Sequence, residues 1–157
     1  MRTRFEQPRP GDIARMLAGI LGLRVQASAR KDPDPDGLYV GTYVDDGGHL
    51  VAVCGADLRF VAGSGAALSM IAPEVAEEMI EAGDVSDPIL DNFHEILNIC
   101  SRLLMKESGG AHLRLERALR PADGGSKFES LTAAGRRLSF DVSLQGYGDS
   151  RLSYVIT

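Results

Sequence analysis

The sequence predicts an α+β fold in which helices pack on one face of an antiparallel sheet. Apolar residues at helical spacing indicate one helix near the N-terminus and two in the middle of the chain, with strand-like runs before and after these two. The strand-like runs are joined by tight turns rich in Gly and Asp, which connect antiparallel neighbours. At 157 residues with 44% hydrophobic side chains, we expect a single domain over residues 1–157.

The first segment is expected to be a flexible arm over residues 1–9, followed by a helix over 10–23. Ile13, Leu17 and Ile20 recur at helical spacing, so this stretch is expected to pack into the core and not to serve as a secretion signal. No run approaches the ~18 apolar residues that a membrane span needs. We therefore expect no membrane contact.

Strands and short turns are expected to fill the region up to the central helices. The predicted strands cover 24–29, 39–44, 49–54, 58–62 and 66–71, and Gly63-Ser64-Gly65 is interpreted as a turn between the last two. A helix over 74–82 follows, with Gly83 as its stop. After the central helix we expect strands at 111–119, around 128–131, at 137–145 and at 151–156, the last two joined by a hairpin at 146–149.

The central helix is predicted over 86–107, with Asp87-Pro88 as its start signal and Gly109-Gly110 as its end. Its apolar residues gather in one arc, which is expected to be buried: Ile89, Phe93, Ile96, Leu97, Cys100, Leu103 and Leu104. On the opposite side, four polar residues fall within roughly 60° of each other and form a polar stripe: Asp91, Glu95, Asn98 and Arg102.

Composition excludes several classes of function. A net charge of −5 and the absence of Trp argue against a nucleic-acid partner. Cys54 and Cys100 lie in apolar runs without zinc spacing, which is typical of reduced thiols in a cytoplasmic protein. The three His residues are dispersed, so no metal site is predicted. There is no phosphate-binding glycine loop with its Lys, and no nucleophile elbow.

The polar stripe is slightly unfavourable for an isolated helix. Asp91 and Glu95 are a like-charge pair four residues apart, which costs about 0.2–0.5 kcal/mol, and Asn98 is a poor residue in mid-helix. The stripe contains no activated nucleophile, so any reaction there depends largely on groups of the substrate. A solvated helix face without a function is the alternative interpretation of the spacing alone.

The spacing of the stripe resembles a known signature. Asp91-x-x-x-Glu95-x-x-Asn98, followed 22 residues later by Pro121, is similar to the motif of the CheC/CheX/FliY chemotaxis phosphatases. The order of elements from about Tyr39 to the end also resembles the CheX-like order. Only one such helix is visible, as in the CheX type, so the resemblance implies a CheX-like fold.

This resemblance implies hydrolysis of the aspartyl phosphate on a CheY-like response-regulator receiver domain. Asn98 would orient the attacking water, Glu95 would pair with the receiver's lysine, and Asp91 would assist at the partner surface. The receiver would supply Mg²⁺, and this chain would bind no cofactor or metal itself. The family also implies a homodimer, and Pro121 would be a structural stop.

The chain departs from the family around the Asn. Family members often have small residues there, whereas this chain has Leu97 before it and Ser101-Arg102 after it. Arg102 either forms a solvated ion pair or contacts a phosphate or acidic surface of the partner. The alternative functions are a non-catalytic adaptor of the same fold that binds a receiver or signalling partner, and an unrelated α+β dimerisation domain with a coincidental stripe.

Overall fold

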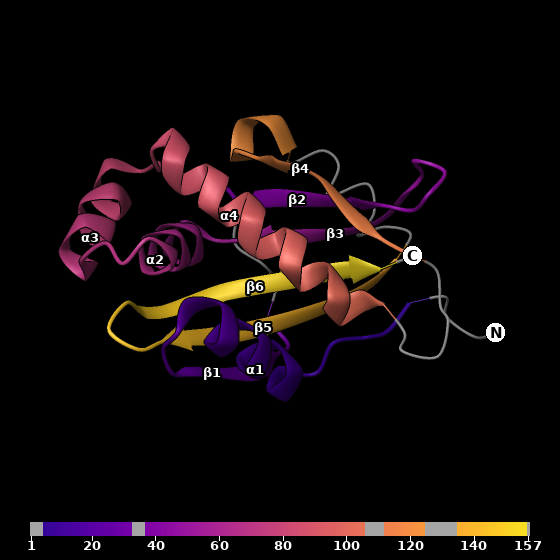
Figure 1. Cartoon of the computed structure of the whole chain (residues 1–157), viewed down its shortest axis with the longest axis horizontal. Coiled ribbons are helices and arrows are strands. Elements are labelled where there is room, and N and C mark those ends of the chain that lie inside the picture. Colours follow the sequence, from indigo (N-terminus) through magenta and orange to yellow (C-terminus); the bar gives the residue numbers. More distant parts are fainter. Residues whose placement is uncertain (1–4, 33–36, 106–111, 125–134, 157) are drawn as a thin grey trace.

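The computed structural model describes residues 5–32, 37–105, 112–124 and 135–156 (Figure 1). In chain order its elements are α1 (Pro10–Leu21), β1 (Val25–Arg30), β2 (Tyr39–Val44), β3 (Leu50–Ala56), α2 (Leu58–Leu68), α3 (Pro73–Ala82), α4 (Asp87–Cys100), the 3₁₀ helix η1 (Ser101–Leu104), β4 (Arg114–Leu119), β5 (Arg136–Leu144) and β6 (Gly148–Ile156).

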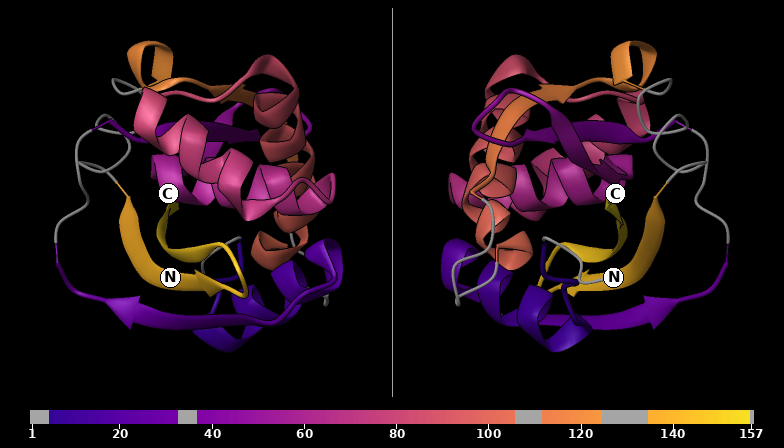
Figure 2. Two further views of the ribbon diagram at one scale, coloured as in Figure 1. Left: turned by 90° about the vertical axis from the view of Figure 1, so that its left-hand side faces the viewer. Right: turned by 90° about the vertical axis from the view of Figure 1, so that its right-hand side faces the viewer.

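The strands form one sheet in the order β1-β5-β6-β3-β2-β4, and every neighbouring pair is antiparallel. Helices α1, α2 and α4 bury their apolar residues in a single core with one face of this sheet. Figures 1 and 2 show α4 lying obliquely across that face, with α3 outside α2. The predicted α+β class, with an antiparallel sheet and helices on one face, is confirmed.

The apolar arc of the central helix forms the middle of the core. All seven of its predicted residues are buried, from Ile89 to Leu104. Below them, β2 is buried along its whole length, since Val40 packs into a second, smaller cluster on the other face of the sheet. The strand beneath α4 is therefore packed on both faces of the sheet, and this packing fixes the position and direction of the helix.

The segment after Asp57 is a helix, and the prediction of strands at 58–62 and 66–71 was wrong. The Asp57 carboxylate caps α2 by accepting a hydrogen bond from the Phe60 amide at 2.9 Å. Every residue of 60–67 is buried, so the middle of α2 lacks the exposed polar face that marks a half-buried helix. Gly63 and Gly65 do not form a turn. They lie inside the helix, where a Cβ on Gly65 would lie 2.6 Å from the Ile89 Cγ2 and a Cβ on Gly63 would lie 3.3 Å from the Tyr147 Cβ.

The central helix also ends earlier than predicted. α4 stops at Cys100, and the chain continues as the 3₁₀ helix η1, which carries Arg102. The proposed stop at Gly109-Gly110 and the strand around 128–131 lie outside the described residues. Asp87 is the first residue of α4, after Ser86 at the cap position. Its carboxylate accepts a hydrogen bond from Arg120, so it does not serve as the expected cap.

The expected flexible arm is attached to the body along its described part. The Phe5 side chain is buried, and the Glu6 amide donates to the Leu104 carbonyl at 2.8 Å. Cys54 and Cys100 are free thiols in the core, as predicted. Within the described ranges, no helix has the length and apolar character needed to cross a bilayer.

Candidate functional site

The polar stripe of α4 lies on the surface, as its helical spacing predicts. Asp91, Glu95 and Asn98 are exposed, whereas Ile96 and Leu97 between them are completely buried. Glu95 and Asn98 are three residues apart, so their side chains are neighbours on one face. Among the described residues, no hydrogen bond or ion pair engages either side chain, and both are available to a partner.

Arg102 is exposed as well, but it belongs to η1 and not to α4. A 3₁₀ helix advances about 120° per residue instead of the 100° of an α-helix. The change of helix type between Asn98 and Arg102 therefore alters the direction in which a regular stripe would continue. Arg102 is therefore exposed on η1, whereas Asp91, Glu95 and Asn98 are exposed on α4 itself.

Asn92 ties α4 to α2 and was not predicted from the sequence. Its side-chain amide donates to the Gly65 carbonyl at 2.9 Å and to the Ser69 hydroxyl at 2.6 Å. A Cβ on Gly65 would lie 2.6 Å from the Ile89 Cγ2, so the two helices touch at this glycine. Asn92 is next to Asp91 in the sequence, so this contact anchors α4 to α2 at the beginning of the exposed site.

The start of α4 is held by a charged cluster that sequence reasoning also missed. The Arg120 guanidinium donates to the Asp87 carboxylate at 2.9 Å and to the Val85 carbonyl at 3.0 Å, and it pairs with Asp84 at 3.2 Å. The Tyr39 hydroxyl donates to Asp84 at 2.6 Å. This hydrogen bond is the main cause that lowers the pKa of Asp84, while burial raises the pKa of Tyr39.

The same cluster shows where the last motif residue lies. Pro121 follows Arg120 and begins a helical turn over 121–124. Arg120 reaches Asp87 in the first turn of α4, whereas Asn98 lies eleven residues further on, about 16 Å along the helix axis. Pro121 therefore belongs to the support of the helix start and is not brought beside Asn98.

Charge is distributed unevenly around the site. The stretch from 60 to 101 has eight acidic residues, all exposed, and no Lys or Arg: Glu74, Glu77, Glu78, Glu81, Asp84, Asp87, Asp91 and Glu95. The rest of the chain carries all 17 Lys and Arg against the other 14 of the 22 acidic residues. The surface of α3 and α4 is therefore rich in carboxylates, of which Glu77 pairs with Arg59, and Asp84 and Asp87 pair with Arg120.

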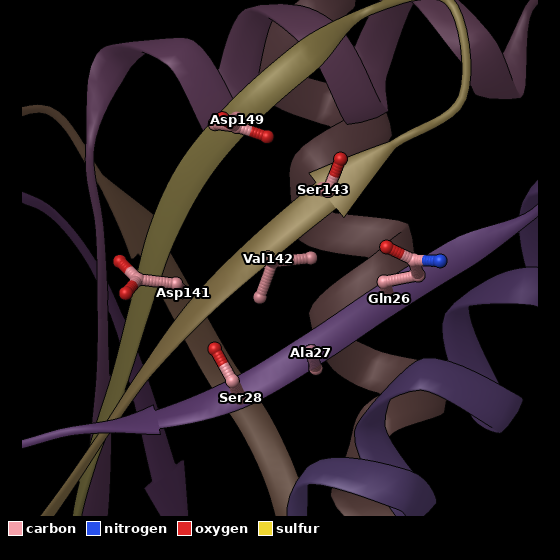
Figure 3. Close-up of a pocket in the computed structure, with 7 residues that line it drawn as sticks. All are labelled: Gln26, Ala27, Ser28, Asp141, Val142, Ser143 and Asp149. Atoms are coloured by element: carbon pink, nitrogen blue, oxygen red, sulfur yellow. The ribbon is translucent and has the colours of Figure 1, made fainter.

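A groove lies on strands β1, β5 and β6, away from the exposed residues of α4 (Figure 3). It is lined by polar side chains that include Gln26, Ser28, Asp141, Ser143 and Asp149. Their strand neighbour Val142 points into the core that α4 covers, and successive side chains alternate between the two faces of a strand. The groove therefore lies on the face of the sheet opposite to Glu95 and Asn98.

Comparisons with known proteins bear on the fold. No protein-family model and no curated protein matches the sequence. Among solved structures, FliY of Thermotoga maritima is similar with a TM-score of 0.65 and 17% identity, over 92% of this chain and 81% of that one. A chain of the FliG–FliM complex from H. pylori gives a TM-score of 0.63 and 9% identity, over 94% of this chain and 85% of that one. The FliM middle domain from H. pylori gives 0.59 and 7%, over 94% and 84%.

These likenesses define the class of fold. The chain has the fold of the CheC/CheX/FliY family, which the motif around Glu95 and Asn98 resembles. At 7–17% identity the likeness is one of architecture. FliY and the FliM middle domain share this fold at TM-scores of 0.65 and 0.59, so the fold alone does not assign an activity.

Proposed function

We propose that this protein is a CheX-like phosphatase that hydrolyses the aspartyl phosphate of a CheY-like response-regulator receiver domain. The observation that carries the proposal is the state of the motif on α4. Glu95 and Asn98 are exposed, adjacent and without partners among the described residues, while the residues between them anchor the helix in the core. This combination presents a carboxylate and an amide on a rigid surface.

The proposed chemistry needs only these two groups from this chain. Water attacks the phosphorus, the bond between phosphorus and the aspartyl oxygen breaks, and inorganic phosphate leaves a free receiver carboxylate. Such a transfer depends mainly on an in-line water and on neutralised phosphoryl oxygens. The Asn98 amide orients the water, and Glu95 pairs with the receiver's lysine. The receiver holds the Mg²⁺ that neutralises the phosphate.

The acidic surface supports a partner whose contact face is basic. Exposed carboxylates on α3 and α4 attract such a face and speed up its encounter with the site. Asp91 lies one turn before Glu95 and adds to this attraction. Arg102 is positively charged and lies in η1, after the end of α4. We propose that it contacts acidic residues around the receiver's phosphorylation site.

Phosphate release from a receiver charged with acetyl phosphate and Mg²⁺ tests the proposal. The protein is expected to accelerate the loss of phosphate, and Asn98→Ala and Glu95→Ala are each expected to remove that acceleration by about 10²-fold or more. Both side chains are exposed, so the melting temperature of each variant should stay within roughly 2–3 °C of the wild-type value, as is usual for a surface substitution. Gln26→Ala in the groove on the opposite face is the matched control and keeps the full rate. Unchanged rates in both α4 variants would end the catalytic claim.

The second candidate is an adaptor of the same fold that binds a receiver or signalling partner without turnover. The nearly equal likeness to the FliM middle domain favours it, together with the bulky Leu97 and Arg102 around Asn98. Binding of a phosphorylated receiver without faster dephosphorylation would select this function. Acceleration gained in Arg102→Gly would then show that the arginine blocks the approach.

The proposal includes a homodimer, as the resemblance implies, and a cytoplasmic location, which the two reduced cysteines favour. Sedimentation equilibrium at micromolar concentration is expected to give twice the 16.8 kDa mass of the chain. A monomer under these conditions would remove the dimer from the proposal and leave the site unchanged.

A further inference from the structure

The peptide unit just before Asn98 is held from outside its own helix. The Leu97 carbonyl accepts a hydrogen bond from the Tyr43 hydroxyl at 2.7 Å, across 54 residues of sequence. Tyr43 lies on β2 in the floor of the core, and both residues are completely buried. This bond connects the sheet directly to the backbone that carries the Asn98 side chain.

The same turn is where the helix changes type. In an α-helix the Leu97 carbonyl accepts from the amide of residue 101. Here the Ser101 amide donates to the carbonyls of Asn98 and Ile99, and the Ser101 hydroxyl donates to the Asn98 carbonyl at 2.7 Å. The Tyr43 hydroxyl thus provides a donor for a buried carbonyl at the point where the helix tightens into η1.

The Leu97 side chain is fixed against the same strand. A Cβ on Gly41 would lie 2.4 Å from the Leu97 Cδ1, so this position of β2 leaves room for the leucine only because it is glycine. Gly41 and Tyr43 are two residues apart and point to the same face of the strand. One strand therefore holds both the side chain and the carbonyl of Leu97.

We propose that Tyr43 is a positioning residue of the α4 site. Through the Leu97 carbonyl, its hydroxyl fixes the turn of Asn98, so that the amide meets the partner in one orientation. Tyr43 is completely buried, so its own side chain is not part of the surface that a receiver would contact. The inference rests on the proposed function for its effect on rate, whereas the anchoring itself is independent of any activity.

Tyr154 provides a matched control in the same cluster. It is also completely buried, and its ring centre lies 6.4 Å from that of Tyr43. Its buried hydroxyl makes no hydrogen bond to the backbone of α4, and its polar neighbours are the Tyr43 hydroxyl and the Cys100 thiol. Tyr43→Phe and Tyr154→Phe therefore each remove one buried hydroxyl from neighbouring positions, but only the first removes a hydrogen bond to the backbone of α4.

Amide hydrogen exchange tests the anchoring without any partner. In Tyr43→Phe the amides of Ser101 and Arg102 are expected to exchange about tenfold faster, because the turn has lost its attachment to the sheet. In Tyr154→Phe they are expected to exchange as in the wild type. Exchange along β5, which carries neither substitution, reports on overall folding in both variants. Equal exchange at Ser101 and Arg102 in the two variants would overturn the anchoring.

The dephosphorylation assay tests the consequence. Tyr43→Phe is expected to lower kcat about tenfold while the receiver concentration at half-maximal rate stays unchanged, because the contact surface is intact. Tyr154→Phe keeps the wild-type kcat. If Tyr43→Phe fails to fold, Ser101→Ala loosens the same turn from inside and is expected to lower kcat in the same way. A wild-type kcat in the folded Tyr43→Phe or Ser101→Ala variant overturns the positioning role. An inactive wild-type protein overturns the proposed function instead. Amide exchange then still tests whether Tyr43 anchors the turn.

Discussion

At the scale of single residues, the cluster at the start of α4 gives a pH dependence with a defined sign. The Tyr39 hydroxyl and Arg120 both favour ionised Asp84, and the pKa of this carboxyl is lowered in the folded protein. A lowered folded pKa contributes stability above the ordinary value near pH 4, and this stability is lost as the pH falls through the folded pKa.

Asp84→Asn is therefore expected to weaken the acid dependence of the melting temperature. Between about pH 5 and pH 2 the wild type should lose more stability than the variant, because the variant has no carboxyl to protonate at this position. Thermal unfolding across this range measures the difference, with the exposed Glu78→Gln as the control on α3. Parallel curves for the wild type and Asp84→Asn would contradict the assignment.

At the scale of elements, close packing of α2 against α4 depends on a glycine. Gly65→Ala would place its Cβ 2.6 Å from the Ile89 Cγ2 and 3.1 Å from the Ile89 carbonyl oxygen, so α4 must shift. We expect a loss of about 1–3 kcal/mol in the free energy of unfolding. Gly19→Ala in α1 meets nothing within 4 Å and is expected to gain about 0.5–1 kcal/mol. Urea denaturation measures both, and a loss of equal size in the two variants would contradict the packing argument.

The same elements show what the sequence can and cannot predict. The two faces of α4 are visible in the sequence because the helix is half buried, so its apolar arc and exposed stripe repeat with the helical period. α2 is buried all round, and its Gly63-Ser64-Gly65 resembles a turn when the neighbouring Tyr147 and Ile89 are unknown. The contact between Tyr43 and Leu97 depends on the pairing of distant segments, for which a single sequence carries no signal.

At the scale of the whole molecule, the separation of charge predicts how a partner approaches. The exposed carboxylates of α3 and α4 face a basic partner surface in the proposed complex, and salt screens such attraction over about 10 Å at 0.1 M and 3 Å at 1 M. Receiver binding should therefore weaken with rising salt, mainly through slower association.

Neutralising part of this surface is expected to have the same effect. Glu78→Gln combined with Glu81→Gln should lower the association rate about two- to fivefold at low salt, because each exposed pair is worth ~0.2–1 kcal/mol. Asp149→Asn on the opposite face of the sheet should leave it unchanged. Stopped-flow association at several salt concentrations measures both. A rate without salt dependence would contradict the electrostatic role of this surface.

The central claim is that the exposed Asn98 amide directs water onto another protein's acyl phosphate. Asn98→Asp tests it most directly, since the change keeps the shape of the side chain and replaces its NH₂ donor by a carboxylate oxygen. The decisive measurement is the rate constant for phosphate loss from a charged receiver with saturating wild-type or Asn98→Asp protein. We expect clear acceleration by the wild type and the receiver's own rate with Asn98→Asp. Equal acceleration by both proteins would contradict the account.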